Sequence, residues 1–299
     1  MIVHLIDGTY ELFRHFYGIR RMQKGDPPFG AVRGVLAMVL QMIETGATHI
    51  GVATDHVIES FRNELWDGYK TGAGIDAALW AQFHPLEEAL TAMGVVVWPM
   101  VELEADDALA SAAALAAANP GVEKVCIWTP DKDLAQCVVA GRVVQVDRKS
   151  GKVRDADGVR EKFGVSPASI PDYLALVGDA ADGYPGLAGF GAKSTAAVLA
   201  RFEHIVHIPS DGAEWCVGVG SSGRLAATLR EQRELALLFR TLATLRSDAA
   251  LFDDVERLRW RGPTEYFAAY ARRIDAPELV NRASAIRSAA RRSDRGATL

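Results

Sequence analysis

Aspartates follow several short apolar runs in this sequence, at the positions where buried strands would end. Asp7 comes directly after IVHLI, Asp55 follows THIGVAT, and Asp131 and Asp133 lie in TPDKDL after KVCIW. A single aspartate in such a place is usually a helix cap. In an open parallel sheet, however, the carboxyl ends of the strands line one crevice. Three runs that end in this way therefore predict a group of carboxylates at one edge of a sheet.

Two further acidic segments add to this group. ELEADDALAS opens an alanine-rich helical stretch, and LVGDAADGYPG has the composition of a turn; taken alone, each has a simple structural explanation in dipole compensation or turn formation. Carboxylates gathered closely repel one another unless cations neutralise them. Oxygen ligands without His or Cys clusters favour Mg²⁺ or Mn²⁺, and two such ions about 4 Å apart suit in-line attack on a phosphodiester. The candidate metal ligands are Asp7, Asp55, Glu104, Asp106, Asp107, Asp131, Asp133, Asp179 and Asp182.

These acidic residues need a scaffold that brings strand ends together. Apolar runs predict strands at 2–6, 48–54, 95–98, 124–128 and 142–146. Helical patterns between them lie at about 31–43, 77–93 and 108–118. Strands that alternate with helices predict parallel βαβ units and a sheet covered on both faces.

The second part of the chain has a different character, because helices dominate from about residue 166. The pattern predicts a helix at 195–202, a Gly- and Ser-rich loop at 210–223 and one long amphipathic helix at 225–245. The tail at 287–299 is basic and polar, and we expect it to be frayed.

The composition is that of an ordinary globular protein. The 299 residues are 49% hydrophobic and 24% charged, which excludes a disordered chain, collagen or a small disulfide scaffold. No apolar stretch reaches the roughly 18 residues that cross a bilayer, and the N-terminus lacks a signal-peptide design. Three cysteines without metal spacing suit a reduced cytoplasm. The net charge of −5 divides into −9 for residues 1–182 and +4 for residues 183–299; without the nine candidate ligands the remainder is mildly basic, as suits a polyanion binder.

The motifs together resemble the 5′-nuclease family, which comprises flap endonucleases and the 5′–3′ exonuclease domain of bacterial DNA polymerase I. The resemblance rests on LIDGTYELFR, VATDHVIESFRNELWDGYK, ELEADDALAS, TPDKDLAQ and DYLALVGDAADGYPGLAGFGAKSTA, in the family's order and spacing, and extends to about residue 245. It implies an α/β fold with a PIN-like, mostly parallel central sheet flanked by helices and carrying a helical arch. A helical helix–hairpin–helix (helix–three-turn–helix) region follows. All nine carboxylates match the family's metal-site positions, which hold two or more Mg²⁺ or Mn²⁺ ions.

The resemblance also assigns residues to the handling of DNA. Lys70 matches a catalytic position at the base of the arch, facing the scissile phosphate, and Arg14 matches a phosphate-binding position that offsets developing charge. Arg62 is expected at the DNA, and Tyr69 is expected to stack on a terminal base. In PGLAGFGAKST, backbone and side-chain contacts to duplex phosphates are expected, and the family analogy allows a K⁺ ion there. The residues concerned are Gly186, Gly189, Gly191, Lys193 and Ser194.

Two departures from the family pattern concern the arch and the second metal-site loop. No Lys or Arg occurs between Thr71 and Met100, where family arches commonly carry basic residues. The usual SDN of the metal-site loop reads Ala181-Asp182-Gly183, which keeps the carboxylate but loses neighbouring side-chain hydrogen bonds.

The resemblance implies a domain order and a function. We expect a PIN-like nuclease domain at 1–165 with its arch at about 59–93, a helix–hairpin–helix DNA-binding region at 166–262, and C-terminal helices with a basic tail at 263–299. We expect a metal-dependent, structure-specific 5′-nuclease in primer removal and repair, monomeric, cytoplasmic and nucleoid-associated. Its partners would be DNA with a 5′ flap, 5′ overhang or nick, and RNA–DNA primer junctions, with no membrane. A PIN-type ribonuclease and a non-cleaving DNA-junction binding protein remain the alternatives.

Overall fold

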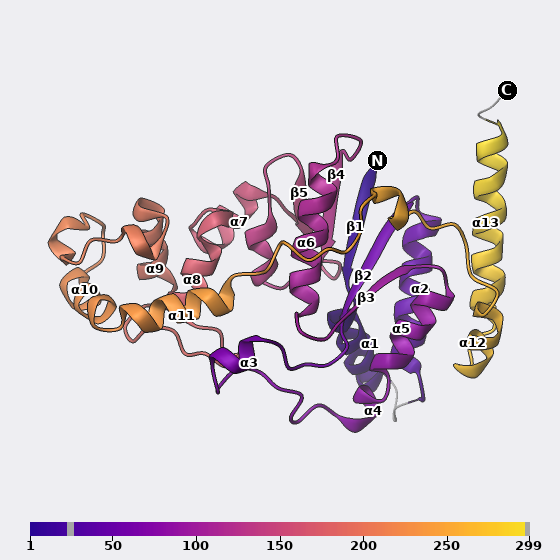
Figure 1. Cartoon of the computed structure of the whole chain (residues 1–299), viewed down its shortest axis with the longest axis horizontal. Coiled ribbons are helices and arrows are strands. Elements are labelled where there is room, and N and C mark those ends of the chain that lie inside the picture. Colours follow the sequence, from indigo (N-terminus) through magenta and orange to yellow (C-terminus); the bar gives the residue numbers. More distant parts are fainter. Residues whose placement is uncertain (23–26, 297–299) are drawn as a thin grey trace.

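The computed structural model describes residues 1–22 and 27–296, and it places a six-stranded sheet in the N-terminal part of the chain (Figure 1). The strand order is β3-β2-β1-β4-β5-β6. All neighbours pair in parallel except β6, which is antiparallel to β5. The predicted α/β class and five of these strands are confirmed, and β6, with only two residues, was not predicted. The strands are β1 (Ile2–Asp7), β2 (His49–Asp55), β3 (Val96–Met100), β4 (Lys124–Trp128), β5 (Val143–Val146) and β6 (Val153–Arg154).

Helices cover both faces of the sheet. Side chains along β1 point alternately to the two faces, so successive residues pack against different helices. Val3 and Leu5 pack with α6 in one hydrophobic cluster. Ile6, on the other face, packs with α1, α2 and α5. The sheet is therefore a buried middle layer, and its strand ends are the free edge. The helices of this part are α1 (Gly8–Met22), α2 (Gly30–Glu44), α5 (Phe83–Ala92) and α6 (Ala105–Ala118).

The segment that was expected to form an arch contains little regular structure. Before residue 83 it carries two single-turn helices, α3 (Arg62–Leu65) and α4 (Ala77–Trp80), joined by turns and irregular backbone. Its last part is not an arch, because Phe83, Leu86 and Leu90 of α5 are buried in the same core as α2. The expectation of an arch extending to residue 93 is therefore corrected: α5 belongs to the layer over the sheet.

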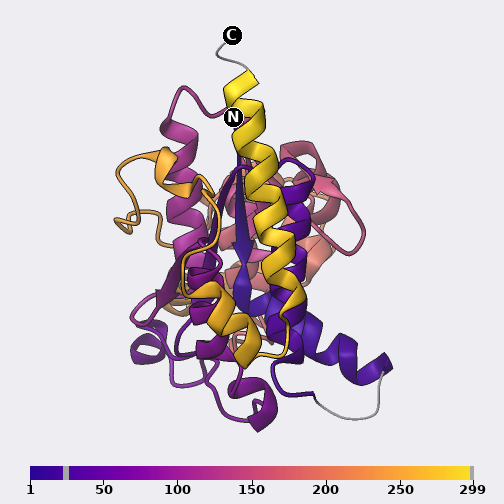
Figure 2. The same ribbon diagram turned by 90° about the vertical axis from the view of Figure 1, so that its right-hand side faces the viewer.

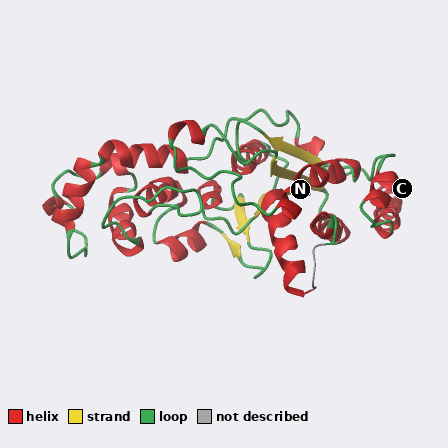
Figure 3. Ribbon diagram, turned by 90° about the horizontal axis from the view of Figure 1, so that it is seen from below, coloured by secondary structure: helices red, strands yellow, loops and turns green. Residues whose placement is uncertain are grey.

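The next part of the chain is helical, and Figure 3 shows it as the end of the molecule without strands. Its core is a separate hydrophobic cluster that contains Leu174, Trp215 and Phe239. The single helix expected at 225–245 is instead two helices that meet at Gln232. No Gly or Pro marks the break; α10 packs near residues 212–214 whereas α11 packs on α8, so tertiary contacts bend the chain. The helices are α7 (Ala156–Phe163), α8 (Ile170–Val177), α9 (Ala192–Phe202), α10 (Ser222–Glu231) and α11 (Arg233–Ala243).

After α11 the chain returns to the sheet as an extended strap, residues 244–266, which crosses α6 (Figure 1). It leads into α12 (Phe267–Arg273) and α13 (Glu278–Gly296), and α13 lies against α2 (Figure 2). The tail expected to fray from residue 287 is helical to Gly296, and its last three residues lie outside the described part. None of the described helices has the length and apolar character needed to span a membrane. Short 3₁₀ turns complete the fold: η1 (Asp133–Cys137), η2 (Pro167–Ser169), η3 (Ile205–His207), η4 (Gly212–Glu214) and η5 (Val255–Leu258).

Candidate metal centre

Asp7 and Asp55 are the last residues of β1 and β2, and hydrogen-bond donors of the neighbouring segments orient both. The amide of Tyr10 donates to Asp7 Oδ1 at 2.8 Å, and the Thr129 hydroxyl donates to Asp7 Oδ2 at 3.1 Å. The amide of Ala105 donates to Asp55 Oδ1 at 2.8 Å. Parallel pairing thus places the two carboxylates at the same edge, as the sequence predicted.

Glu104 caps α6, and its carboxylate is buried among donors. The Ser60 hydroxyl donates to Oε1 at 2.8 Å, and Arg62 donates to the same oxygen at 3.0 Å. Lys70 Nζ lies 2.7 Å from Oε2. Burial alone would raise the pKa of Glu104, but the charges of Lys70 and Arg62 outweigh it and hold this pKa below its usual value. Glu104 is therefore a stable anion.

Asp107 does not belong with the metal ligands, although the sequence suggested it. Both oxygens accept from the Arg62 guanidinium, at 2.7 and 2.8 Å. Oδ1 also accepts from the amide of Arg246 at 2.8 Å, and Oδ2 from that of Glu104 at 3.0 Å. A carboxylate offers about four lone-pair sites, and these four donors use them. The expectation is corrected: Asp107 is fully buried and binds the protein itself.

The expectation that Arg62 contacts DNA is likewise corrected, because its guanidinium is buried inside the protein. The residue is only 1% exposed. Besides the two carboxylates, Nε donates to the carbonyl of Leu242 at 2.8 Å and Nη2 to that of Thr244 at 3.2 Å. All five N–H groups of the guanidinium are thereby engaged inside the protein.

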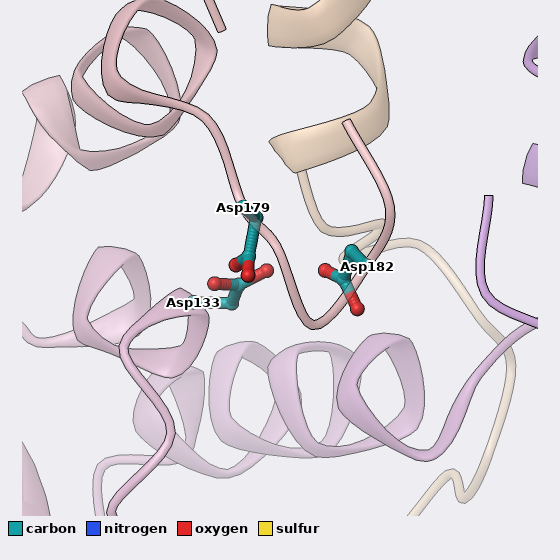
Figure 4. Close-up of side chains that lie close together, drawn as sticks. All are labelled: Asp133, Asp179 and Asp182. Carbon is teal, nitrogen blue, oxygen red and sulfur yellow. The ribbon is translucent and has the colours of Figure 1, made fainter. Parts of the chain in front are cut away.

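A second group of carboxylates comes from η1 and the loop after α8. Oxygen atoms of Asp133, Asp179 and Asp182 lie within 4.8 Å of one another, and Figure 4 shows the three side chains converging. Lys132 Nζ lies 2.7 Å from Asp179, and Lys70 Nζ lies 3.0 Å from Asp182. Asp133 Oδ1 is buried and has no hydrogen-bond partner. An unpartnered anionic oxygen in this place is what a bound cation would satisfy.

The carboxylates raise one another's pKa values across the edge of the sheet. Burial, and then the Asp55 and Asp131 charges, raise the pKa of Asp7 to about 7. Burial, followed by the charges of Asp131 and Asp7, raises the pKa of half-buried Asp106 well above its usual value. Burial is also the largest cause that raises the pKa values of Asp55, Asp133 and Asp182, with neighbouring carboxylates adding to it and the Lys70 charge opposing it. Asp131 is exposed at the rim of the group. This oxygen-only donor set fits divalent cations of the Mg²⁺ or Mn²⁺ kind, because they would relieve both the repulsion and the unpartnered oxygen.

Lys70 lies between the two carboxylate groups, since its ammonium bonds to Glu104 and Asp182. Burial would lower its pKa, but these two carboxylates raise it well above the usual value. Lys70 is therefore a permanent cation beside the carboxylates. Its predicted contact with a scissile phosphate stays a prediction.

Tyr69, beside it, does not offer its ring to a base. The side chain is 4% exposed and belongs to the core of the helical region. Its hydroxyl points back toward Glu104 at 3.4 Å. The expectation of stacking is therefore corrected for the structure as it stands.

Arg14 projects from α1 and is partly exposed. Its Nε donates to Glu11 at 2.8 Å, and Glu11 itself is buried. The buried carboxylate of Glu11, one helical turn after Asp7, thus holds the Arg14 guanidinium, and part of the guanidinium remains open to solvent.

The Gly-rich turn before α9 separates into an internal part and an exposed part. Gly186 is buried with φ of 69°, and a Cβ there would collide with the backbone of Gly178, so this glycine serves internal packing. Gly189, Gly191 and Lys193 are exposed, and nothing lies within 4 Å of a Cβ built at Gly191. The Ser194 hydroxyl bonds to both the amide and the carbonyl of Gly191. The expected phosphate contacts of Gly186 and of the other residues stay predictions.

Sequence reasoning did not single out the polar residues that hold the carboxylates. Ser60 and Thr129 each donate a hydroxyl to a carboxylate, Lys132 pairs with Asp179, and Gln136 donates to the carbonyl of Asp133. The only signal was their place inside motifs that resemble the family: Ser60 lies in VATDHVIESFRNELWDGYK, and Thr129, Lys132 and Gln136 lie in TPDKDLAQ.

Comparison with known proteins gives a consistent result along the chain. Residues 2–164 match the family described as 5′-3′ exonuclease, N-terminal resolvase-like domain, and residues 165–266 match its C-terminal SAM fold. The chain is 34% identical over 268 residues to DNA polymerase I of Pseudomonas aeruginosa, covering 85% of this chain but only 28% of that protein. It is 31% identical over 274 residues to flap endonuclease Xni of Edwardsiella ictaluri, covering 88% of this chain and 99% of that one.

A solved structure shares the fold at low identity. The flap endonuclease of bacteriophage T5, in a pseudo-enzyme–product complex with DNA and metal ions, superposes with a TM-score of 0.64 at 16% identity. The superposition covers 96% of this chain and 98% of that one.

Proposed function

Because the chain belongs to the 5′-3′ exonuclease family, we propose that it is a divalent-metal-dependent, structure-specific 5′-nuclease acting on DNA. Its substrates would be 5′ flaps, 5′ overhangs and nicks, including RNA–DNA primer junctions, in replication and repair. The observation that carries the proposal is the metal centre. Carboxylates from β1, β2, α6, η1 and the loop after α8 interact electrostatically there. Asp133, Asp179 and Asp182 converge, and Asp133 Oδ1 is unpartnered.

The carboxylates would hold the ions in two neighbouring places. Asp7, Asp55, Glu104 and Asp106 would hold one, and Asp131, Asp133, Asp179 and Asp182 would hold the other. When bound, such ions generate a nucleophile from water near neutral pH and stabilise charge on the attacking and leaving oxygens. Mg²⁺ and Mn²⁺ both satisfy this donor set, and a K⁺ ion at the Gly-rich turn is a separate prediction.

The chain's own cations would act on the phosphate. Lys70, already at the carboxylates, would place its ammonium against the scissile phosphate, and an interaction of this kind stabilises developing charge. Arg14 would bind a neighbouring phosphate through the open side of its guanidinium. Gly189, Gly191, Lys193 and Ser194 would position duplex DNA through its backbone, which carries no sequence information.

The site is built within one chain, so the proposal requires no second subunit, and we propose that the protein acts as a monomer. It would work where genomic DNA is, in the cytoplasm and associated with the nucleoid.

A cleavage assay tests the proposal directly. The purified protein is incubated with Mg²⁺ or Mn²⁺ and a labelled 5′-flap duplex, a nicked duplex or single-stranded RNA. We expect cleavage of the flap and the nicked duplex, little cleavage of the RNA, and no activity in EDTA. The variant carrying Asp131→Asn and Asp133→Asn is the matched control, since it removes metal ligands and leaves the exposed DNA-facing residues unchanged.

Each other result assigns a different function. Cleavage of RNA alone would make the protein a PIN-type ribonuclease. Tight binding to flap DNA without cleavage under any ion would make it a junction-binding protein. Equal turnover by the double variant would mean that the carboxylates do not hold the catalytic ions.

A further inference from the structure

The C-terminal end of α11 and the first residues of the strap, residues 242–246, lie against the segments that carry the metal-site carboxylates. This end of the helical region is distant in sequence from those segments. The hydrogen bonds that join them are made chiefly by two side chains, Gln136 and Arg62.

Gln136 connects residues 242–246 to the Asp133 group. Its Nε2 donates to the carbonyl of Asp133 and to the carbonyl of Ala243, each at 2.9 Å. Its Oε1 accepts from the amide of Leu245 at 3.0 Å. One amide side chain therefore fixes the backbone of a candidate metal ligand to the end of α11.

Arg62 makes the corresponding connection to the Glu104 group. It donates to Glu104 and, through two bonds, to Asp107, while its remaining donors reach the carbonyls of Leu242 and Thr244. Asp107 in turn accepts from the amide of Arg246. The start of α6 is thus attached to the same residues as η1.

The helix that ends here also packs on the third carboxylate-bearing segment. α11 lies on α8, and α8 ends at Val177, two residues before Asp179. A shift of α11 would therefore be felt at Glu104, Asp133 and Asp179 together, because packed elements transmit displacement rather than absorb it.

We propose that Gln136 and Arg62 are positioning residues that couple the helical region to the metal centre. The position of residues 242–246 sets the geometry of both carboxylate groups. Binding of duplex DNA by the helical region and binding of ions at the sheet edge therefore favour the same conformation of these residues. This inference rests on the proposed function for the identity of the DNA partner, but the coupling to metal binding does not depend on cleavage.

Gln136→Met is the test variant, because methionine keeps the length of the side chain and loses all three hydrogen bonds. Outer contacts that orient metal ligands typically change metal affinity or activity 10–100-fold. We expect Mn²⁺ affinity, measured by titration calorimetry without DNA, to fall by about this factor. The single-turnover cleavage rate at saturating DNA should fall similarly, while duplex affinity in EDTA changes less than about twofold.

Ser111→Ala is the matched control. Its buried hydroxyl also holds the strap, since it donates to the carbonyl of Arg246 and accepts from the amide of Ala249, and neither bond involves a candidate metal ligand. We expect this variant to lower the melting temperature and to leave Mn²⁺ affinity and cleavage rate unchanged.

Hydrogen exchange at individual amides distinguishes a loss of this coupling from a general loss of stability. In the wild type, Mn²⁺ should slow exchange of the Leu245 and Arg246 amides, and in Gln136→Met this slowing should be lost. Wild-type Mn²⁺ affinity in Gln136→Met, or an equal loss of affinity in Ser111→Ala, would overturn the coupling. A wild-type protein that binds Mn²⁺ with this dependence but cleaves no DNA would instead refute the proposed function alone.

Discussion

Replacing Arg62 by alanine distinguishes a buried structural cation from a DNA contact. The guanidinium is almost fully enclosed and donates five hydrogen bonds to two carboxylates and two carbonyl groups. In Arg62→Ala the Asp107 carboxylate remains buried with only two amide donors. Two main-chain carbonyls also lose a partner, so the variant retains uncompensated negative charge and polarity in the interior.

The size of the effect follows from this burial. Removing one partner of a buried ion pair costs about 3–5 kcal/mol, whereas an exposed pair contributes about 0–1 kcal/mol. A typical domain is stable by about 5–15 kcal/mol, so the variant would lose a large part of its free energy of unfolding. With a urea m-value near 3 kcal/mol/M, the unfolding midpoint would fall by about 1–2 M.

Urea unfolding followed by circular dichroism measures this loss, with Arg160→Ala as the control. Arg160 also bonds to an aspartate, Asp157, but the two side chains are 56% and 92% exposed. We expect the control to change stability by less than about 1 kcal/mol. Arg62→Lys, which keeps the charge and loses the planar fork, should fall between the two. If Arg62→Ala is as stable as the control but binds duplex DNA much more weakly, the buried assignment is wrong and Arg62 is a DNA contact.

Three further predictions concern the metal, Lys70 and pH. Mg²⁺ at about 100 times its dissociation constant should stabilise the protein by about 2.7 kcal/mol, which a rise in melting temperature would show. An equal rise in a variant carrying Asp133→Asn and Asp179→Asn would refute binding at these carboxylates. Lys70→Ala should lower the single-turnover rate by about 10²–10³ with little change in flap affinity; weak binding with a normal saturated rate would make Lys70 an anchor only. Burial, then the Arg14 and Arg148 charges, lower the pKa of His15 from 6.5 to about 4. Because the unfolded chain takes up the proton first, stability should fall as pH drops from about 6.5 to about 4, and a His15→Gln variant with an unchanged pH slope would contradict this.

The sequence predicted the layout of the sheet edge because that layout depends on local patterns. Apolar runs of strand length identify β1, β2 and β4, and an aspartate at the end of each must appear at the carboxyl edge of a parallel sheet. Asp179 and Asp182 are a different case, because they lie after a helix. Their segment alone has the composition of a turn, and its resemblance to a known motif was the stronger reason to assign them to the same centre.

The errors arose where distant parts of the chain decide the outcome. Arg62 reads as one more surface cation until the carbonyls of Leu242 and Thr244, about 180 positions away, are placed beside it. Asp107 has the same residue type and nearly the same position as Asp106, and only the guanidinium on one side of α6 separates their roles. The break at Gln232 likewise has no local marker, because packing against different neighbours produces it.

The return of the chain to the sheet has a consequence for synthesis on the ribosome. Phe267 of α12, Ile274 directly after it and Leu279 of α13 complete the same core as α2, which ends at Glu44. At roughly 5–20 residues per second, these covering residues emerge about 10–50 s after α2 has been made. Throughout that interval the α2 side chains that pack against these residues lack this cover, and apolar surface exposed in this way favours aggregation and chaperone binding. A polypeptide truncated near residue 266, where the family match ends, would leave these α2 side chains permanently without that cover.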